Sequence, residues 1–275
     1  MNKYVTCLTI AGSDSGGGAG IQADLKTMSA IGVYGMSAIT AITAQSTTAV
    51  NDIYAISPQI VESQISTVLD DIECNTVKIG MIYLPENAEI IATTLSKYKI
   101  ANIILDPVLI STTQFKLSKD DVVDTIKNKL LPICTLVTPN TDEVYEFTGI
   151  KIKNKEDVCS AAREFIKIGA KAVLIKGGHN IKSTFAYDYL LTNTGYEHWY
   201  RGKAIETNNL HGTGCSLSSA IASYLAQDYP LPQAIAKAKL YITKAISYGS
   251  DTIIGKGNGP INHFFSPKKL IKIKL

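Results

Sequence analysis

The chain has 275 residues, of which 45% are hydrophobic and 19% are charged, and its 27 Lys and Arg against 24 Asp and Glu leave a net charge of +3. This composition is typical of a folded, soluble protein, and the length allows one or two domains. Because no long basic run is present, we expect neither a nucleic acid nor a membrane as partner. A modest positive charge suits an anionic small molecule.

Predicted strands and helices alternate along most of the chain. Short β-branched runs bounded by turn residues are predicted as strands, and the segments between them have helical periodicity. The strands are expected at 4–11, 37–43, 77–82, 101–105, 134–137 and 172–175. The helices are expected at 24–31, 60–69, 88–97, 118–130 with Ser118 as its cap, 142–148, 156–168, 215–226 and 231–248. This alternation indicates βαβ units around a mostly parallel sheet.

The pattern changes after residue 176. Segments 184–191 and 198–201 flank the turn sequence Thr-Asn-Thr-Gly, which predicts an antiparallel hairpin. No linker or repeat divides the chain, so we expect a single domain over residues 1–275. The mixed tail 268–275 is expected to be loosely held.

The cysteines point to a reducing compartment. Cys7, Cys74, Cys134, Cys159 and Cys215 are odd in number, widely spaced and without a CxxC pair, unlike a disulfide frame or a zinc site. The N-terminus shows no signal-peptide pattern, and no apolar stretch reaches the roughly 18 residues of a membrane span. We therefore expect a cytoplasmic protein.

A glycine-rich loop follows the first predicted strand. Five glycines fall between Gly12 and Gly20, at a strand end where ligands of open α/β sheets commonly bind. Neither the dinucleotide fingerprint nor the P-loop spacing is present. Because so many glycines cost chain entropy, we favour a ligand-binding loop over a flexible turn.

A second small-residue cluster stands before the helix predicted at 215–226. Gly212, Thr213 and Gly214 would let a phosphate approach the unpaired amides and the positive dipole of that helix. The same positive end is expected to lower the pKa of Cys215, so that its thiol accepts a proton or a hydrogen bond from a substrate hydroxyl. The other four cysteines are expected to pack in the core. His211 remains open between a phosphate contact and a structural cap.

Polar groups also follow three later strands. Asp106, then Asn140 with Glu143, and then Lys176 come after buried runs whose carboxyl ends meet at one edge of a parallel sheet. The two carboxylates suit magnesium, Lys176 suits phosphate oxygens, and Asn140 suits a nucleotide or a metal-bound water. Together these groups predict a phosphoryl-transfer site.

On these motifs the chain closely resembles the hydroxymethylpyrimidine and phosphomethylpyrimidine kinases of the ribokinase-like superfamily. The resemblance covers almost the whole chain. It rests on the segments Leu8–Asp14, Gly18–Lys26, Thr40–Gln45, Lys78–Met81, Asp106–Val108, Thr138–Asn140, Lys176–His179 and His211–Cys215. Most kinases of the superfamily carry aspartate where Cys215 stands, whereas cysteine is usual in this group and in its pyridoxal-kinase relatives.

The resemblance implies a three-layer α/β/α sandwich with a mostly parallel central sheet and a small antiparallel hairpin. It implies a magnesium-dependent enzyme that uses ATP to phosphorylate 4-amino-5-hydroxymethyl-2-methylpyrimidine to its monophosphate and then to the diphosphate, in thiamine biosynthesis. It also implies a homodimer. Pyridoxal kinase is the nearest alternative, and Gln45 is the main discriminator, because its amide can pair with an aminopyrimidine edge. A non-catalytic nucleotide or pyrimidine sensor is the alternative of another class.

The resemblance also implies roles for individual residues. Asp24 and Gln45 would bond the ring nitrogen or amino groups of the pyrimidine. Asp106 and Glu143 would manage magnesium. The full implied set comprises Gly12, Asp24, Gln45, Met81 and Val108 at the pyrimidine, Asn140 and Lys176 at the ATP phosphates, and Gly212, Thr213 and Gly214 as the anion hole with Cys215 beside the attacking hydroxyl. Segment 109–116 lacks the glycine that is common in the following loop of the family.

Overall fold

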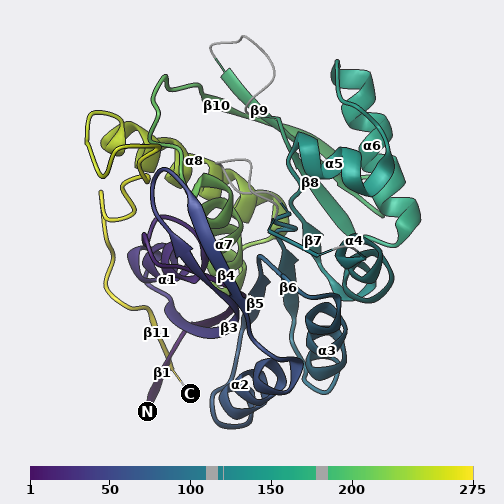
Figure 1. Ribbon diagram of the computed structural model, residues 1–275, viewed down its shortest axis with the longest axis vertical. Helices are drawn as coiled ribbons and strands as arrows, with labels where there is room; N and C mark the ends of the chain where they lie inside the picture. The colour runs from purple at the N-terminus through teal and green to yellow at the C-terminus, as the bar shows by residue number, and fades with distance from the viewer. Residues whose placement is uncertain (110–116, 120, 178–184, 275) are drawn as a thin grey trace.

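The computed structural model describes residues 1–109, 117–119, 121–177 and 185–274. The strands of its main sheet are β2 (Thr6–Asp14), β3 (Tyr34–Gln45), β4 (Val50–Ala55), β5 (Thr76–Ile79), β6 (Asn102–Leu105), β7 (Leu136–Val137), β8 (Ala172–Lys176), β9 (Phe185–Thr192) and β10 (Glu197–Lys203). They lie in the order β10-β9-β8-β7-β6-β5-β2-β3-β4 (Figure 1). The neighbouring strands β3, β2, β5, β6, β7 and β8 pair in parallel. The remaining strands, β4, β9 and β10, join by antiparallel pairing. The mostly parallel sheet and the hairpin are therefore as predicted.

Helices cover both faces of this sheet. One face carries α1 (Gly20–Ile31), α7 (Thr213–Ala226) and α8 (Leu231–Gly249). The other carries α2 (Pro58–Asp71), α3 (Pro85–Leu95), α4 (Val122–Thr125), α5 (Thr141–Thr148) and α6 (Lys155–Ile168). Figure 1 shows the two helical layers with the sheet between them. The expectation of a three-layer sandwich is confirmed.

Each central strand supplies both hydrophobic cores. Along β6, Ile103 and Leu105 lie in the core under α2, α3, α5 and α6, whereas Ile104 lies in the core under α1, α7 and α8. Successive side chains of a strand point to opposite faces, so a strand covered on both sides must be apolar throughout. This burial explains the near-continuous β-branched runs in the sequence.

The loops of the carboxyl edge meet at a topological switch point. From β2 the chain passes to β3 on one side, and later to β5 on the other side of β2. Loops that leave neighbouring strands in opposite directions open a crevice between them. The glycine-rich loop 15–19 stands at this crevice.

Two local predictions are wrong. No helix begins at Ser118; α4 begins at Val122, because Asp121 before it has φ 68, a left-handed conformation that cannot continue a helix. After α4 the chain continues as a π-helical turn, Ile126–Leu130, and a 3-10 turn, Leu131–Ile133. Strand β4 was not predicted, because Asn51 and Asp52 face solvent on this edge strand and interrupt the apolar pattern.

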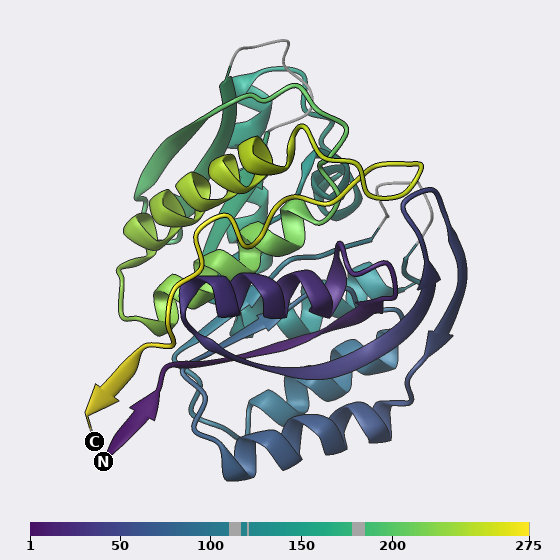
Figure 2. The ribbon, with the colours of Figure 1, turned by 90° about the vertical axis from the view of Figure 1, so that its left-hand side faces the viewer.

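The tail is held rather than loose. β11 (Lys272–Lys274) pairs antiparallel with β1 (Asn2–Tyr4), and the amide of Ile271 donates to the carbonyl of Gly32 at 2.8 Å. Figure 2 shows both chain ends together at one corner of the molecule. The expectation of a loosely held tail is therefore wrong for residues 268–274, and residue 275 lies outside the described residues. In the described part of the chain, no helix combines the length and apolarity needed to cross a membrane.

Candidate active site

A cavity of about 350 Å³ opens at the carboxyl edge of the sheet. Its wall combines residues from both ends of the chain, which include all but one of the site residues expected from the sequence: Gly12, Gln45, Met81, Asp106, Val108, Asn140, Glu143, Lys176, Gly212, Thr213, Gly214 and Cys215. A cavity of this size, with apolar walls and a few convergent polar groups, is typical of a small-molecule site.

Asp24 is the exception. Its side chain is fully buried and does not border the cavity. The ammonium of Lys78 lies 2.8 Å from Oδ2 and 3.0 Å from Oδ1, while the hydroxyls of Thr9 and Ser219 donate to the same two oxygens. These four hydrogen bonds, from three donor groups, fill the usual acceptor capacity of a carboxylate. The expected contact between Asp24 and the pyrimidine is therefore not supported; Asp24 instead fixes Lys78, which does border the cavity.

The helix terminus predicted as an anion site is present at α7. Gly212 caps this helix with φ 79, the amide of Thr213 donates to Leu210, and the amide of Ser216 donates to Gly212. The amides of Gly214 and Cys215 between them are the ones that helix geometry leaves for a ligand. A Cβ on Gly214 would lie 3.3 Å from the Lys176 ammonium. The small residue thus keeps the helix terminus next to a cation.

Lys176 and Asp106 form an ion pair on the cavity wall. The lysine Nζ lies 2.6 Å from Asp106 Oδ1, and the Thr138 hydroxyl also donates to that oxygen at 3.1 Å. Burial opposes the charge on both groups, but their mutual attraction prevails, so the pKa of Asp106 is lowered and the pKa of Lys176 is raised. Both groups are charged at neutral pH.

Asn140 and Glu143 form a capping box at the start of α5. The side-chain oxygen of Asn140 accepts from the amides of Asp142 and Glu143, and Glu143 Oε2 accepts from the Asn140 amide at 2.7 Å. The amide nitrogen of the Asn140 side chain is the group it retains for a ligand. Burial raises the pKa of Glu143 to about 7, although Lys176 lowers it.

The carboxylates of Asp106 and Glu143 suit magnesium only as part of a larger complex. Among the described residues, no group of three or more His, Cys, Asp or Glu side chains is placed to hold a metal. Magnesium is commonly bound by one or two carboxylates together with water and substrate phosphates. Two buried carboxylates beside a phosphate site fit that arrangement.

The expected activation of Cys215 is wrong for the protein without ligands. Burial raises the pKa of its thiol to about 11, although the Lys78 ammonium and the Gly20 amide act to lower it. The α7 terminus therefore does not make a thiolate here, because the desolvation cost of the charged sulfur is larger. All five cysteines are free, and Cys7 and Cys134 are fully packed in the cores as expected.

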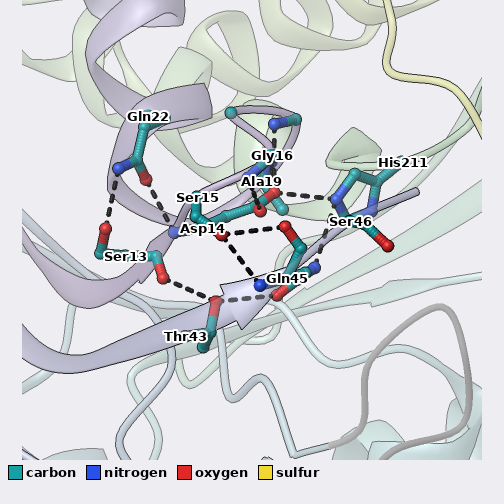
Figure 3. A network of polar contacts seen from close by, with 12 residues as sticks. Ser13, Asp14, Ser15, Gly16, Ala19, Gln22, Thr43, Gln45, Ser46 and His211 are labelled. Atoms are coloured by element: carbon teal, nitrogen blue, oxygen red, sulfur yellow. Dashed lines mark hydrogen bonds and ion pairs between the residues drawn. The ribbon is translucent and has the colours of Figure 1, made fainter. Parts of the chain in front are cut away.

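A polar network holds the glycine-rich loop against the start of α7 (Figure 3). Asp14 accepts from the amides of Gly16, Gly18 and Ala19 at 2.8 to 3.0 Å, and His211 Nε2 lies 2.9 Å from its Oδ2. The side-chain amide of Gln45 lies between His211 and Thr43. His211, which the sequence left open, thus contacts a carboxylate of the glycine loop.

The end of the cavity near Gln45 has apolar walls. Met81, Ala41 and Leu117 form a small buried cluster against which Val108 packs. A Cβ on Gly12 would lie 2.6 Å from the Met81 sulfur, so only glycine leaves that methionine in place. This end suits a flat heteroaromatic ring with polar edges.

Three further cavity residues were missed from the sequence. Lys78 is a charged residue inside a buried β-branched strand, and that rarity is a usable signal. Lys239 on α8 and Asp188 on β9 form an ion pair on the cavity wall, and their pairing across 51 positions leaves no local pattern. Gly178 and His179, which carry part of the family resemblance, and segment 110–116 lie outside the described residues.

The fold, the anion-binding helix terminus and the lysine-carboxylate pair beside it define a small-molecule kinase of the ribokinase-like class. The structure of Staphylococcus aureus pyridoxal kinase in complex with AMP-PCP and pyridoxal superimposes with a TM-score of 0.86 at 30% identity, covering 94% of this chain and 93% of that one. The structure of Clostridium difficile phosphomethylpyrimidine kinase superimposes with a TM-score of 0.77 at 44% identity, covering 88% and 99%.

Comparison with known sequences indicates one family within the ribokinase-like kinases. The family model described as phosphomethylpyrimidine kinase matches residues 14–262. The hydroxymethylpyrimidine/phosphomethylpyrimidine kinases of Rhizobium meliloti and Staphylococcus aureus are 45% and 39% identical, covering 94% and 98% of this chain and 96% and 97% of those proteins. The thiamine biosynthesis bifunctional protein ThiED of Geobacter sulfurreducens is 43% identical over 94% of this chain, which spans 52% of that protein. The chain belongs to the phosphomethylpyrimidine kinase family.

Proposed function

We propose that this kinase transfers the γ-phosphoryl group of ATP to the hydroxymethyl group of 4-amino-5-hydroxymethyl-2-methylpyrimidine, and then a second phosphoryl group to the resulting monophosphate, as a step of thiamine biosynthesis. One observation carries the proposal: Lys176 and the amide-rich start of α7 share a single cavity with Gln45 and Met81. A phosphoryl-binding element and a ring-sized polar and apolar pocket thus face the same space. The names of the relatives support the choice of substrate.

The pyrimidine is proposed to lie at the Gln45 end. Gly12, Met81 and Val108 would contact the ring, and the Gln45 amide would pair with its amino group and the adjacent ring nitrogen. Asp24 is not part of this proposed site, because its oxygens accept hydrogen bonds from Lys78, Thr9 and Ser219.

ATP is proposed to extend toward α8. Lys176 and the Asn140 side-chain nitrogen would bind its phosphates, and the amides of Gly214 and Cys215, in the loop shaped by Gly212 and Thr213, would receive the moving phosphoryl group. Ile242 and Ile246 of α8 offer apolar walls for the base at the end marked by the Lys239–Asp188 pair.

Magnesium would be held by Asp106 and Glu143 together with the nucleotide phosphates. Its chemistry when bound is to neutralise negative charge on the phosphate oxygens. Binding would require Glu143 to be ionised, and its raised pKa means that the proton must leave this carboxyl first.

Cys215 is proposed to contact the attacking hydroxyl. Phosphoryl transfer in most analyses passes through a loose transition state in which little deprotonation of the nucleophile is needed early. A neutral thiol would orient the hydroxyl by accepting its hydrogen bond. To take the hydroxyl proton, Cys215 would first have to release its own proton to solvent, and the Lys78 ammonium favours the resulting thiolate. In the second transfer the nucleophile is already an anionic phosphate, so Cys215 matters less.

We further propose that the chain works as one cytoplasmic domain that forms a homodimer. The site requires residues from Gly12 to Cys215, which supports one domain, and five free cysteines support a reducing compartment. Exposed Ile42 and Tyr54, paired across β3 and β4 at the open sheet edge, offer an apolar surface for a second copy.

The test is to incubate the purified protein with ATP, magnesium and the hydroxymethylpyrimidine and to follow the products with time. The proposal predicts the monophosphate first and the diphosphate later, each with release of ADP. Tight binding of the pyrimidine without ADP release would instead support the sensor alternative. Pyridoxal kinase remains the second candidate, because solved pyridoxal kinases share the fold at TM-scores of 0.85 to 0.86.

A further inference from the structure

The side chain of His211 contacts both Asp14 and Gln45, and these two contacts determine where the hydrogens of the three side chains lie. His211 Nε2 lies 2.9 Å from Asp14 Oδ2 and 3.4 Å from the Gln45 atom assigned as Nε2. Burial raises the pKa of Asp14, but the hydrogen bonds from His211 and the amides of Ala19 and Gly16 outweigh it and leave the pKa below its ordinary value. The Asp14 carboxylate is therefore ionised at neutral pH and can only accept.

An ionised partner settles which nitrogen of His211 carries a proton. Nε2 must donate to Asp14, and a protonated ring nitrogen has no lone pair for a second donor. A Gln45 N–H directed at the same Nε2 would place two donors face to face. The Gln45 carbonyl oxygen, in contrast, could accept from that N–H.

Thr43, on the other side of the Gln45 amide, independently indicates the same orientation of that amide. Its hydroxyl has one proton and lies 2.9 Å from the carbonyl oxygen of Ser13 and 3.2 Å from the Gln45 atom assigned as Oε1. The shorter contact takes the proton, so the hydroxyl is left as an acceptor toward Gln45. Nitrogen and oxygen of a side-chain amide are indistinguishable by shape, and the hydrogen-bond network decides between them.

We infer that the Gln45 amide is held with its oxygen toward His211 and its nitrogen toward Thr43, and that the Asp14–His211 pair is the positioning device that fixes this orientation. The amide then keeps one N–H and one oxygen lone pair for the cavity, in a fixed order. That order complements a ring nitrogen next to an exocyclic amino group. The identity of this ligand rests on the proposed function, whereas the orientation of the Gln45 amide does not.

The His211 ring is itself fixed in place. A side chain on Gly18 would overlap its Cδ2, and the His211 amide donates to the Gly259 carbonyl at 3.1 Å. The residue is only 7% exposed. His211 therefore acts as a rigid donor. A reversed Gln45 amide would leave polar groups of the site and of the pyrimidine unpaired, and unpaired buried polar groups weaken binding strongly.

Three variants test this role by kinetics. His211→Leu removes the donor, His211→Gln restores an N–H near the position of Nε2, and Gln22→Leu loosens the same loop by removing its bonds to Asp14 and Ser13 without contacting Gln45. We expect His211→Leu to raise KM for the hydroxymethylpyrimidine about tenfold with little change in kcat or in KM for ATP, and to erode its preference over pyridoxal. His211→Gln should recover most of the preference for the hydroxymethylpyrimidine. Gln22→Leu should lower the melting temperature and leave this substrate preference unchanged.

Nuclear magnetic resonance of 15N-labelled histidine tests the proton position in the wild-type protein without any substrate. The protein has four histidines, so the signal that is missing from both His211→Leu and His211→Gln identifies His211. We expect a protonated Nε2 at pH 8. An unprotonated Nε2, or an unchanged pyrimidine preference in His211→Leu, would overturn the inference. A wild-type protein that does not phosphorylate the pyrimidine would remove the proposed function but would leave the tautomer measurement standing.

Discussion

Gly212 lies directly against the backbone of Gly18, so that a Cβ at position 212 would overlap the carbonyl oxygen of Gly18. The two glycine clusters, almost two hundred residues apart in sequence, thus pack together at the start of α7. A left-handed φ of 79 at Gly212 adds a second reason for glycine. The shape of the anion site depends on this contact.

Gly212→Ala should therefore damage both folding and activity. We expect a loss of at least about 2 kcal/mol in the free energy of unfolding and a fall of at least about a hundredfold in kcat/KM, since strain and overlap add. Gly195→Ala is the matched control, because Gly195 also has a left-handed φ, of 85, but no atom lies within 4 Å of its Cβ position. Denaturant unfolding and ATP-coupled kinetics of both variants test this; equal effects would show that the contact with Gly18 is unimportant.

The buried pair of Lys78 and Asp24 should stabilise the protein only as a pair. Lys78→Met leaves a buried carboxylate without its cation, and we expect the free energy of unfolding to fall by about 3–5 kcal/mol. Changing Asp24→Leu in addition should restore part of the loss, because the unpaired charge is then removed. If the double variant has a clearly lower free energy of unfolding than Lys78→Met alone, this account is contradicted.

Glu143 should give the ligand-free protein a pH-dependent stability. Its folded pKa is about 7 against an ordinary value of 4.5, so between these values the unfolded state releases the proton while the folded state retains it. Stability therefore decreases as pH rises from about 4.5 to 7, by on the order of 1–3 kcal/mol from this group. Glu143→Gln should remove that part of the slope, whereas Glu146→Gln on the exposed face of the same helix should keep it. Urea unfolding across this pH range measures the difference, and identical slopes for Glu143→Gln and the wild type would refute it.

Cys215 should be a protonated thiol, and therefore slow to react, in the free enzyme at neutral pH. With a pKa of about 11, its alkylation rate should rise about tenfold for each pH unit between pH 7 and 10. Mass spectrometry of iodoacetamide-treated protein follows this residue separately from the half-buried Cys74 and Cys159. A rate already level at pH 7 would mean that the α7 terminus and Lys78 do create a thiolate.

Cys215→Ala should slow the two transfers unequally. The first transfer, which begins from a hydroxyl, should lose about tenfold to a hundredfold in kcat, and the second, which begins from a phosphate, should lose less. The comparison needs the hydroxymethylpyrimidine and its monophosphate as separate substrates. Equal, near-wild-type rates for both would exclude Cys215 as the group that contacts the hydroxyl.

The fold and most of the cavity wall were predictable because their signals are local. Apolar runs such as 172–175 and glycine clusters before helices are visible in a few neighbouring residues. The electrostatics was not predictable, because it depends on burial and on partners brought from distant strands. The thiol of Cys215 was expected to be acidic from its helix alone, yet its desolvation, visible only after folding, reverses the shift. The resemblance likewise implies that Asp24 is a ligand, but Lys78, 54 positions away, lies against its carboxylate.

Side-by-side kinetics with the hydroxymethylpyrimidine and pyridoxal, each with ATP and magnesium, test the central claim most directly. The site at Gln45, with a donor and an acceptor fixed in the order that suits an aminopyrimidine edge, predicts that kcat/KM for the hydroxymethylpyrimidine exceeds that for pyridoxal by at least about tenfold. A large preference for pyridoxal would contradict the proposed substrate and make the protein a pyridoxal kinase.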